Sequence, residues 1–286
     1  MENLVLLGPG ESVSNGIKKI FHLENMETLA LHRVFPTAHT LYNHIPNYWT
    51  WADPDAATDG LLYLLKNHKQ EPDLKKMKIV IPNYVCGTYE EFRKFAGTTP
   101  LGRDIALWEK YSVLLEQVKQ FMNVDIFEAI TTKNISTDPF NNLDYTADIH
   151  DTECFYRFTF PDKVVLGTVR YDSERVIGTA NKWGLENKVS SFMFPIAFYL
   201  RAKNVYCLGF DFVGARFFDK TKTRHAWGNN TARLNESIKF SLSLVDKWKS
   251  WSKIHGMSLY CAAPKSESLL SLSLSYKEIV ADEKHR

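Results

Sequence analysis

The chain lacks the features that identify metal-binding, disulfide-rich and membrane-spanning proteins. It has four cysteines, and no two of them form a Cys-x-x-Cys pair, so their spacing predicts neither a zinc site nor a disulfide framework. Cys207 and Cys261 lie in apolar runs, where we expect reduced, buried thiols. No run approaches the roughly 18 apolar residues of a membrane helix, and the N-terminus has no basic region followed by a long apolar stretch. The sequence therefore predicts a cytoplasmic protein without a metal site.

Neither sign of charge dominates the composition. The chain has 35 Lys and Arg against 33 Asp and Glu, and the resulting net charge of +2 is too small to indicate nucleic-acid binding. Hydrophobic residues make up 44% of the 286 residues, which is enough to bury a full core. Residues 277–286 mix both signs and predict a solvated tail.

Short apolar runs alternate with helix-like segments along the chain. This alternation predicts an α/β fold with a mainly parallel sheet flanked by helices, in a single domain over residues 1–286 with an insertion at about 97–162. In such sheets ligands bind beyond the carboxyl ends of the strands. Gly8–Ser12, Asn43–His44 and Asp211–Arg216 each follow a strand-like run, the second of them a run at His39–Tyr42. We therefore expect these three segments to converge on one crevice.

A glycine-rich turn directly follows the first apolar run, Leu4–Leu7. Glycines let the backbone approach a ligand, successive N–H groups form a concavity for anions, and a following helix would add partial positive charge. These properties predict a nucleotide phosphate site, held by backbone amides. However, Val13 replaces the third glycine of the dinucleotide fingerprint, and the Gly-Lys-Ser/Thr ending of a P-loop is absent, so a tight turn without a ligand is the alternative. The residues of this turn are Gly8, Pro9, Gly10, Glu11 and Ser12.

Two further patterns could indicate metal binding. Asp53-Pro54-Asp55 is formally an Asp-x-Asp motif, which can hold a divalent cation against a diphosphate. Asp-Pro before an amphipathic segment is also the ordinary start of a helix, and we favour that interpretation. His32, His39 and His44 have no spacing that brings two rings to one metal ion.

A basic, polar segment at Asp219–Thr231 separates a strand-like run from a long helical pattern. His225 could act there as a general base, because imidazole titrates near neutrality. Lys220, Lys222 and Arg224 would complement a phosphate. The alternative is a solvated connector in which Asn229 or Asn230 caps the helix.

Polar residues also begin an apolar helical pattern near residue 190. Lys188, Ser190 and Ser191 could bind an anion together with the first amides of the helix, or a serine could simply cap it. Pro264 and Ser266 follow the apolar run that ends at Cys261, at another predicted strand end.

Five stretches, taken in order along the chain, resemble those of a known family. They are a strand with a glycine turn (VLLGPGES), a serine pair opening a helix, a strand ending in Gly-x-Asp-Phe (VYCLGFDF), a histidine-containing loop ending in Gly-Asn-Asn-Thr, and a Leu-Tyr-Cys…Pro-x-Ser strand. Together they resemble the bacterial sialyltransferases of glycosyltransferase family 42 and, more loosely, the pterin diphosphokinase-like proteins. The resemblance covers the first fifty residues and Asn187–Leu270, a little under half of the chain.

The resemblance implies a GT-A-like, Rossmann-type fold with a small lid. It implies inverting, metal-independent transfer from a CMP-sugar, which is the donor substrate, with no cofactor. The implied nucleotide site is the Gly8–Ser12 turn, Asn43 and Ser191 would hold the sugar carboxylate, and His225 would be the general base. His32 and Lys188 fall where the family has an asparagine and an arginine.

The resemblance also has departures. Val213 and Arg216 stand where the family has two tyrosines that stabilise the leaving phosphate, and an arginine can take that role. The lid before His225 is shorter than in the family. The other residues expected to bind the donor are Ser190, Asp211, Pro264 and Ser266.

These observations predict a sialyltransferase-like glycosyltransferase that transfers an acidic sugar to a glycan or lipo-oligosaccharide acceptor. Association with the inner face of the membrane and formation of a homo-oligomer are left open. Two alternatives remain: a metal-dependent diphosphokinase-like enzyme, for which Asp53, Asp55 or Asp211 would be essential, and a non-catalytic nucleotide- or glycan-binding domain.

Overall fold

A computed structural model describes most of the chain. The described residues are 1–20, 25–52, 54–96, 105–132, 154–159, 165–170, 187–211, 215–216, 219–223 and 256–279, with separate helical residues between 238 and 253. The chain divides into two compact units, Met1–Trp49 with Leu200–Arg286 and Thr50–Tyr199, called here the first and the second unit. The single domain and the insertion at about 97–162 stay predictions.

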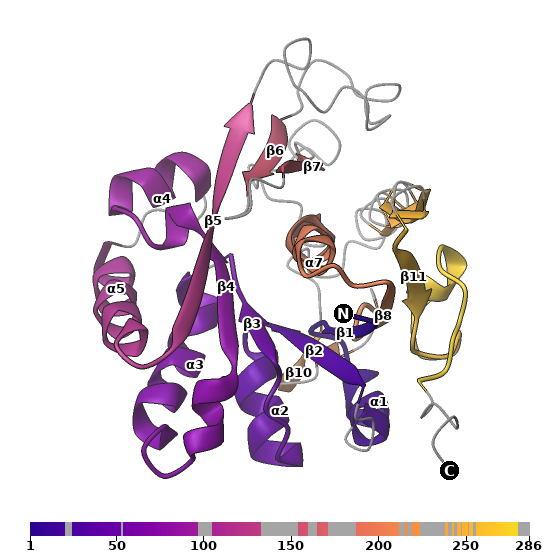
Figure 1. Cartoon of the computed structure of the whole chain (residues 1–286), viewed down its shortest axis with the longest axis horizontal. Coiled ribbons are helices and arrows are strands. Elements are labelled where there is room, and N and C mark those ends of the chain that lie inside the picture. Colours follow the sequence, from indigo (N-terminus) through magenta and orange to yellow (C-terminus); the bar gives the residue numbers. More distant parts are fainter. Residues whose placement is uncertain are drawn as a thin grey trace. The chain divides into compact units, whose positions relative to one another are not determined.

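The first unit is built on a sheet with the strand order β11-β8-β1-β2-β3 (Figure 1). Strand β1 pairs in parallel with β2 and β8, and β8 pairs in parallel with β11. Leu4–Leu7 of β1 are fully buried, and their continuous apolar run is typical of a strand that is covered on both faces. The strand bounds are β1 Asn3–Leu7, β2 Met26–Leu31, β3 Tyr48–Thr50, β8 Asn204–Leu208 and β11 Ser258–Cys261.

Two helices connect the first strands of this unit. Helix α1 (Val13–Ile20) buries Val13, Ile17 and Ile20, which recur at helical spacing, and it contacts α2 (Val34–Tyr42). Helix α2 includes the run His39–Tyr42, so the strand predicted there is wrong. A short apolar run does not distinguish a strand from a helix, and here the buried positions follow the helical repeat from Val34 onward.

The second unit joins parallel and antiparallel strands in the order β4-β5-β6-β7. The first half of β5 pairs in parallel with β4, and its second half pairs antiparallel with β6, which pairs antiparallel with β7. Helices α3 and α5 pack together. The element bounds are α3 Pro54–Asn67, η1 Pro72–Lys76, β4 Lys78–Pro82, η2 Asn83–Val85, α4 Tyr89–Ala96, α5 Ile105–Lys119, β5 Asn123–Thr132, β6 Cys154–Thr159, β7 Val165–Arg170 and α7 Asn187–Tyr199.

The segment after β11 folds back onto that strand. It contains η6 (Leu269–Leu272), and then the amide of Cys261 donates to the carbonyl of Ser275 and the amide of Lys277 donates to the carbonyl of Cys261. Ile279 is only 5% exposed. The solvated tail predicted from residue 277 is therefore wrong at its start, because backbone pairing and an apolar side chain hold residues 277–279 on the first unit.

The predicted α/β class, with a mainly parallel sheet flanked by helices, is confirmed. Cys207 and Cys261 are free and buried, as expected, and burial raises the pKa of both thiols. None of the helices in the described part of the chain is long and apolar enough to cross a membrane.

Candidate functional site

The strand order of the first unit reverses between β1 and β8. From β1 the chain continues to β2 on one side, and it later adds β8 on the other side of β1. In parallel α/β sheets this reversal is where ligands bind, at the carboxyl ends of the strands. The loops at this point are Gly8–Ser12 after β1, called here the glycine loop, and Gly209–Asp211 after β8, called here the Asp211 loop.

The two loops are joined backbone to backbone. The amide of Gly8 donates to the carbonyl of Leu208 and the amide of Gly10 donates to the carbonyl of Gly209, each over 2.7 Å. A Cβ at position 8 would lie 2.7 Å from the carbonyl oxygen of Gly209, and Gly209 itself has φ +79°. Glycines stand here because side chains would separate the two loops.

A buried carboxylate completes the junction. The amide of Ser12 donates to Oδ2 of Asp211 over 2.9 Å, and Oγ of Ser12 donates to Oδ1 over 2.5 Å. The amide of Gly209 in turn donates to Oγ of Ser12 over 3.0 Å. Asp211 is 2% exposed and Ser12 is 3% exposed. Asp211 therefore acts as the acceptor for the start of α1, the role that an N-cap side chain usually has.

These contacts change the expected role of the glycine loop. The amides of Gly8, Gly10 and Ser12 all donate to acceptors within the protein. The expectation that backbone amides of this loop cradle a phosphate is therefore wrong for these three groups, because each N–H already has a short, buried bond. The assignment of Gly8–Ser12 and Asp211 to donor binding stays a prediction.

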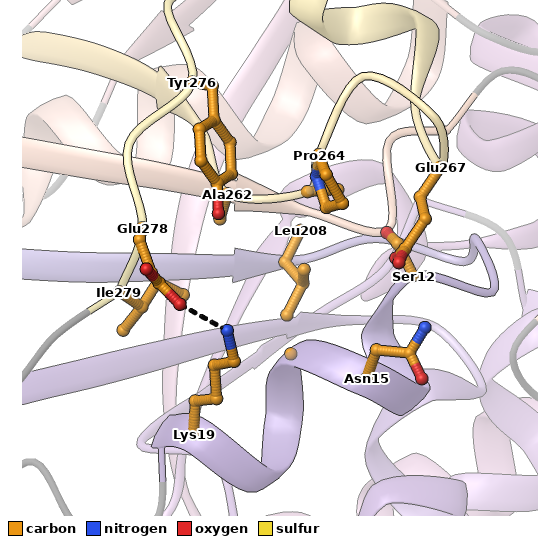
Figure 2. A pocket seen from close by; sticks show the side chains of 12 residues that line it. Ser12, Asn15, Lys19, Leu208, Ala262, Pro264, Glu267, Tyr276, Glu278 and Ile279 are labelled. Carbon is orange, nitrogen blue, oxygen red and sulfur yellow. Dashed lines mark hydrogen bonds and ion pairs between the residues drawn. The ribbon is translucent and has the colours of Figure 1, made fainter.

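A pocket of about 110 Å³ lies beside this junction (Figure 2). One side is formed by Ser12, Asn15 and Lys19 of the α1 region, and the base includes Leu208 at the end of β8. The turn after β11 and the segment of residues 276–279 form the other side. Nζ of Lys19 and Oε1 of Glu278 form an ion pair of 2.5 Å across the pocket.

Several predicted residues meet at this place. Ser12 and Pro264 both line the pocket. Pro9 and Glu11 belong to the glycine loop, and Ser266 lies exposed in the turn that follows Pro264. The carbonyl of Asp211 accepts from the amide of Leu269, which ties the same turn to the Asp211 loop.

Asn43 and His44 do not share this site. Asn43 is the exposed C-cap of α2 with φ 54°, and Nε2 of His44 lies 3.0 Å from Oγ1 of Thr28. Thr28 pairs with Val5 in the middle of the sheet. The predicted convergence of Asn43–His44 with the glycine loop is therefore wrong, since these residues follow a helix and not a strand. Burial, with the nearby His39, lowers the pKa of His44 to about 4.

The other predicted residues are placed only in part. His32 follows β2 with φ 50°, and its carbonyl accepts from Nε1 of Trp49 over 2.8 Å. Helix α7 begins at Asn187, so Lys188, Ser190 and Ser191 lie in its first turns, as predicted. Arg216 lies in β9 (Ala215–Arg216), and Lys220 and Lys222 lie in β10 (Asp219–Thr223), which pairs antiparallel with β9. Asp53, Val213, Arg224, His225, Asn229 and Asn230 lie outside the described residues.

The sequence analysis missed most of the pocket. Asn15 and Lys19 recur with Ser12 at intervals of three and four residues along α1, a spacing that could have indicated one helix face. Glu267 directly follows the predicted Ser266 in the turn after β11, so its place at a strand end could have indicated it. Tyr276 and Glu278 carried no comparable signal, because the fold-back of the C-terminal segment brings them there. Across the described part of the chain, no group of three or more His, Cys, Asp and Glu side chains could hold a metal ion. Metal independence stays a prediction.

Comparison with known proteins finds similarity only among solved structures. No protein-family model and no curated protein matches the chain, so the looser resemblance to pterin diphosphokinase-like proteins has no support from a family model. The sialyltransferase CstII from Campylobacter jejuni, in complex with the substrate analogue CMP-3FNeuAc, is 15% identical with a TM-score of 0.45, over 100% of this chain and 93% of that chain. The monofunctional alpha-2,3-sialyltransferase Cst-I from Campylobacter jejuni is 13% identical with a TM-score of 0.45, over 100% of this chain and 86% of that chain. At these values the reaction has to be inferred from the residues of the site.

Proposed function

We propose that this protein is a sialyltransferase-like glycosyltransferase that moves an acidic sugar from a CMP-sugar donor to the hydroxyl of a glycan or lipo-oligosaccharide. The observation that carries the proposal is the meeting of the glycine loop and the Asp211 loop where the strand order reverses, with a pocket beside them. This is the edge at which parallel α/β sheets bind nucleotides. The donor and the reaction follow from the resemblance of these same stretches to family 42.

The proposed reaction is a single inverting displacement. His225 takes the proton of the acceptor hydroxyl while the acceptor oxygen bonds to the anomeric carbon of the sugar. The bond from that carbon to the phosphate oxygen breaks, and CMP leaves with the electron pair. Arg216 and Lys188 are proposed to stabilise the developing charge on the phosphate, and Ser191 to hold the sugar carboxylate. Neither a metal ion nor a cofactor is part of this proposal.

One contact argues against the diphosphokinase-like alternative. That reaction would need carboxylates that bind a metal ion between phosphates, and Asp211 was one of the candidates. Both carboxylate oxygens of Asp211 accept hydrogen bonds from Ser12, and the side chain is 2% exposed. Asp211 is therefore poorly placed to become a metal ligand.

The test is thermal unfolding with a panel of nucleotides, CMP, CDP, UDP, GDP, ATP and NAD, with and without EDTA. A ligand that binds the folded state raises Tm by mass action. We expect an increase with CMP or CDP that persists in EDTA. An increase only with ATP and magnesium would favour the diphosphokinase-like alternative, and no increase with any nucleotide would refute the proposal.

A second measurement separates chemistry from binding. We expect His225→Ala to abolish the release of CMP from CMP-sialic acid in the presence of an acceptor, while the Tm increase with CMP is retained. Retention of CMP binding in the variant is the internal control for folding. Turnover that survives in His225→Ala would remove the proposed base, and binding without turnover in the wild type would favour a non-catalytic domain.

A further inference from the structure

The turn that follows β11 is hydrogen-bonded to the loop that follows β8. This turn, residues 264–268, is called here the β11 turn, and it leads directly into η6. Oγ of Ser268 donates to the carbonyl of Phe210 over 3.1 Å, and the amide of Leu269 donates to the carbonyl of Asp211 over 3.1 Å. Two consecutive carbonyls of the Asp211 loop are therefore held from the end of the β11 turn.

Ser268 supplies the side-chain part of this connection. Its hydroxyl oxygen also accepts from the amide of Leu270 over 3.2 Å, so Ser268 is the N-cap of η6. The residue is 2% exposed, and its backbone is extended, with φ −144° and ψ 128°. A buried hydroxyl that donates one bond and accepts another is held in one orientation. Ser268 therefore joins η6 to the Asp211 loop in a fixed geometry.

The Asp211 loop has a second attachment and leads to a residue with a proposed role in the reaction. The carboxylate of Asp211 accepts from the amide and the hydroxyl of Ser12, which ties this loop to the glycine loop. Five residues further along the chain lies Arg216, which is proposed above to stabilise the leaving phosphate. A fixed residue limits the positions that the following residues can reach, because each residue extends the chain by only about 3.5 Å. The attachments of the Asp211 loop therefore restrict where Arg216 can lie.

We propose that Ser268 is a positioning residue for sugar transfer: by holding the carbonyl of Phe210, it fixes the start of the segment that carries Arg216. This inference rests on the proposed function, since Arg216 acts only if a phosphate leaves there. A group that stabilises charge developing during the reaction has to be placed accurately, and a misplacement of about 1 Å can lower the rate about a hundredfold. Loss of the Ser268 hydroxyl should therefore lower turnover more than it weakens donor binding.

The first test compares two buried serines of the same segment. Oγ of Ser273 donates to the carbonyl of Leu242 over 3.3 Å, and Ser273 is 6% exposed, so Ser273→Ala removes a similar bond away from the Asp211 loop. The release of CMP from CMP-sialic acid is measured with an acceptor at varied donor concentration. We expect Ser268→Ala to lower kcat about tenfold or more with the donor KM within about threefold, and Ser273→Ala to keep both within about twofold.

The outcomes of this comparison separate the inference from the proposed function. An unchanged kcat in Ser268→Ala, or equal losses in the two variants, would overturn the inference, while turnover by the wild type would leave the proposed function intact. A raised donor KM with an unchanged kcat would assign Ser268 to binding and would also overturn it. A wild type without turnover would refute the proposed function, and the inference would fail with it. Circular dichroism and Tm show whether each variant is folded.

The second test asks whether Ser268 acts through Arg216. In a chain that already carries Arg216→Ala, we expect Ser268→Ala to lower kcat further by less than about twofold, because the group that Ser268 positions is gone. A further loss of about tenfold would show that the two residues act independently. An unchanged kcat in Arg216→Ala alone would show that there is no catalytic group to position. Either result would overturn the inference.

The third test uses a variant that keeps the hydroxyl, in case Ser268→Ala does not fold. Threonine is favoured in extended backbone, so Ser268→Thr suits the conformation of this residue. We expect Ser268→Thr to keep kcat within about threefold of the wild type, because the bond to the carbonyl of Phe210 can still form. A loss of about tenfold or more in folded Ser268→Thr would show that the hydroxyl does not support turnover, and it would overturn the inference.

Discussion

Each unit contains a buried hydrogen-bonded junction, and the two junctions use different chemistry. In the first unit the carboxylate of Asp211 accepts from the amide and the hydroxyl of Ser12. In the second unit the hydroxyl of Tyr111 accepts from Nε1 of Trp51 over 2.8 Å and donates to the carbonyl of Val85 over 2.9 Å. Burial raises the pKa of Tyr111 well above its usual value, so this junction stays neutral.

The surroundings of the two junctions explain the difference. Tyr111 lies in a cluster of rings, with its centroid 5.6 Å from that of Trp108, which stacks on Phe92 at 4.7 Å. Large side chains fill that space. Around Asp211 the backbone itself fills the space, because Gly8 and Gly209 let two loops touch. Burying a carboxylate is unfavourable unless its hydrogen bonds are satisfied. A carboxylate junction of this kind fixes two loops at the edge where the ligand site is proposed, whereas a neutral junction suffices inside a core.

The largest expected effect comes from separating the two loops of the first unit. Gly209 has φ +79°, and a Cβ there would collide with the carbonyl oxygen of Gly8 and lie 2.5 Å from Cγ2 of Val13. We expect Gly209→Ala to lower the free energy of unfolding by about 3 kcal/mol or more, the sum of backbone strain and overpacking. Urea unfolding followed by circular dichroism measures this loss.

Gly256 provides a matched control for backbone strain. Its φ is +78°, and a Cβ there would have nothing within 4 Å. Gly256→Ala should therefore lower the free energy of unfolding by only about 1 to 2 kcal/mol, the strain alone. The excess loss in Gly209→Ala reports the contact between the loops. Equal losses in the two variants would contradict the close approach on which the first junction depends.

His44 gives a third polar contact, which is part-buried and joins its Nε2 to Oγ1 of Thr28. Its folded-state pKa of about 4 lies below the unfolded value of 6.5, so the unfolded chain binds the proton first as the pH falls. The stabilisation is complete above pH 6.5 and is lost as the pH falls toward 4. Between pH 7 and 4.5 we expect this loss to reach about 2 kcal/mol.

The matched measurement compares wild type with His44→Gln by urea unfolding at both pH values. Groups other than His39, which lies near His44, titrate alike in the two proteins, so the difference reports His44 together with its coupling to His39. The wild type should lose more stability on acidification than the variant. Parallel pH profiles would show that His44 is not held in its neutral form, and they would remove it from the comparison.

Much of the fold could be predicted from local patterns in the sequence. The run Leu4–Leu7 before glycines indicated β1 and its turn, and Asp-Pro before an apolar pattern indicated a helix, which begins at Pro54. His39–Tyr42 was mistaken for a strand because four residues are too few to separate the two repeats. Pairing between distant segments had no local signal, and neither the order of strands nor the fold-back of residues 273–279 could be read from the sequence.

The site was predictable where its residues follow strands directly. Gly8, Ser12 and Asp211 were identified in this way, and they do meet. Their hydrogen bonds to one another could not be foreseen, because a sequence does not show whether an amide donates to a ligand or to a residue 199 positions away. Asn43 was misplaced because its position depended on the wrong secondary structure.

The smallest effect is expected at the neutral junction. Tyr111→Phe keeps the ring and removes the hydroxyl that joins Trp51 to Val85, leaving one buried donor and one buried acceptor without this partner. We expect the free energy of unfolding to fall by about 1.5 kcal/mol, as is typical of a lost neutral hydrogen bond in a core. Tyr276→Phe, at a residue that is 50% exposed, is the control and should stay within about 0.5 kcal/mol of the wild type. The contradicting outcome is a loss of unfolding free energy in Tyr111→Phe as large as that in Gly209→Ala. The hydroxyl of Tyr111 would then contribute as much to stability as the contact between the two loops, even though it is neutral and surrounded by rings.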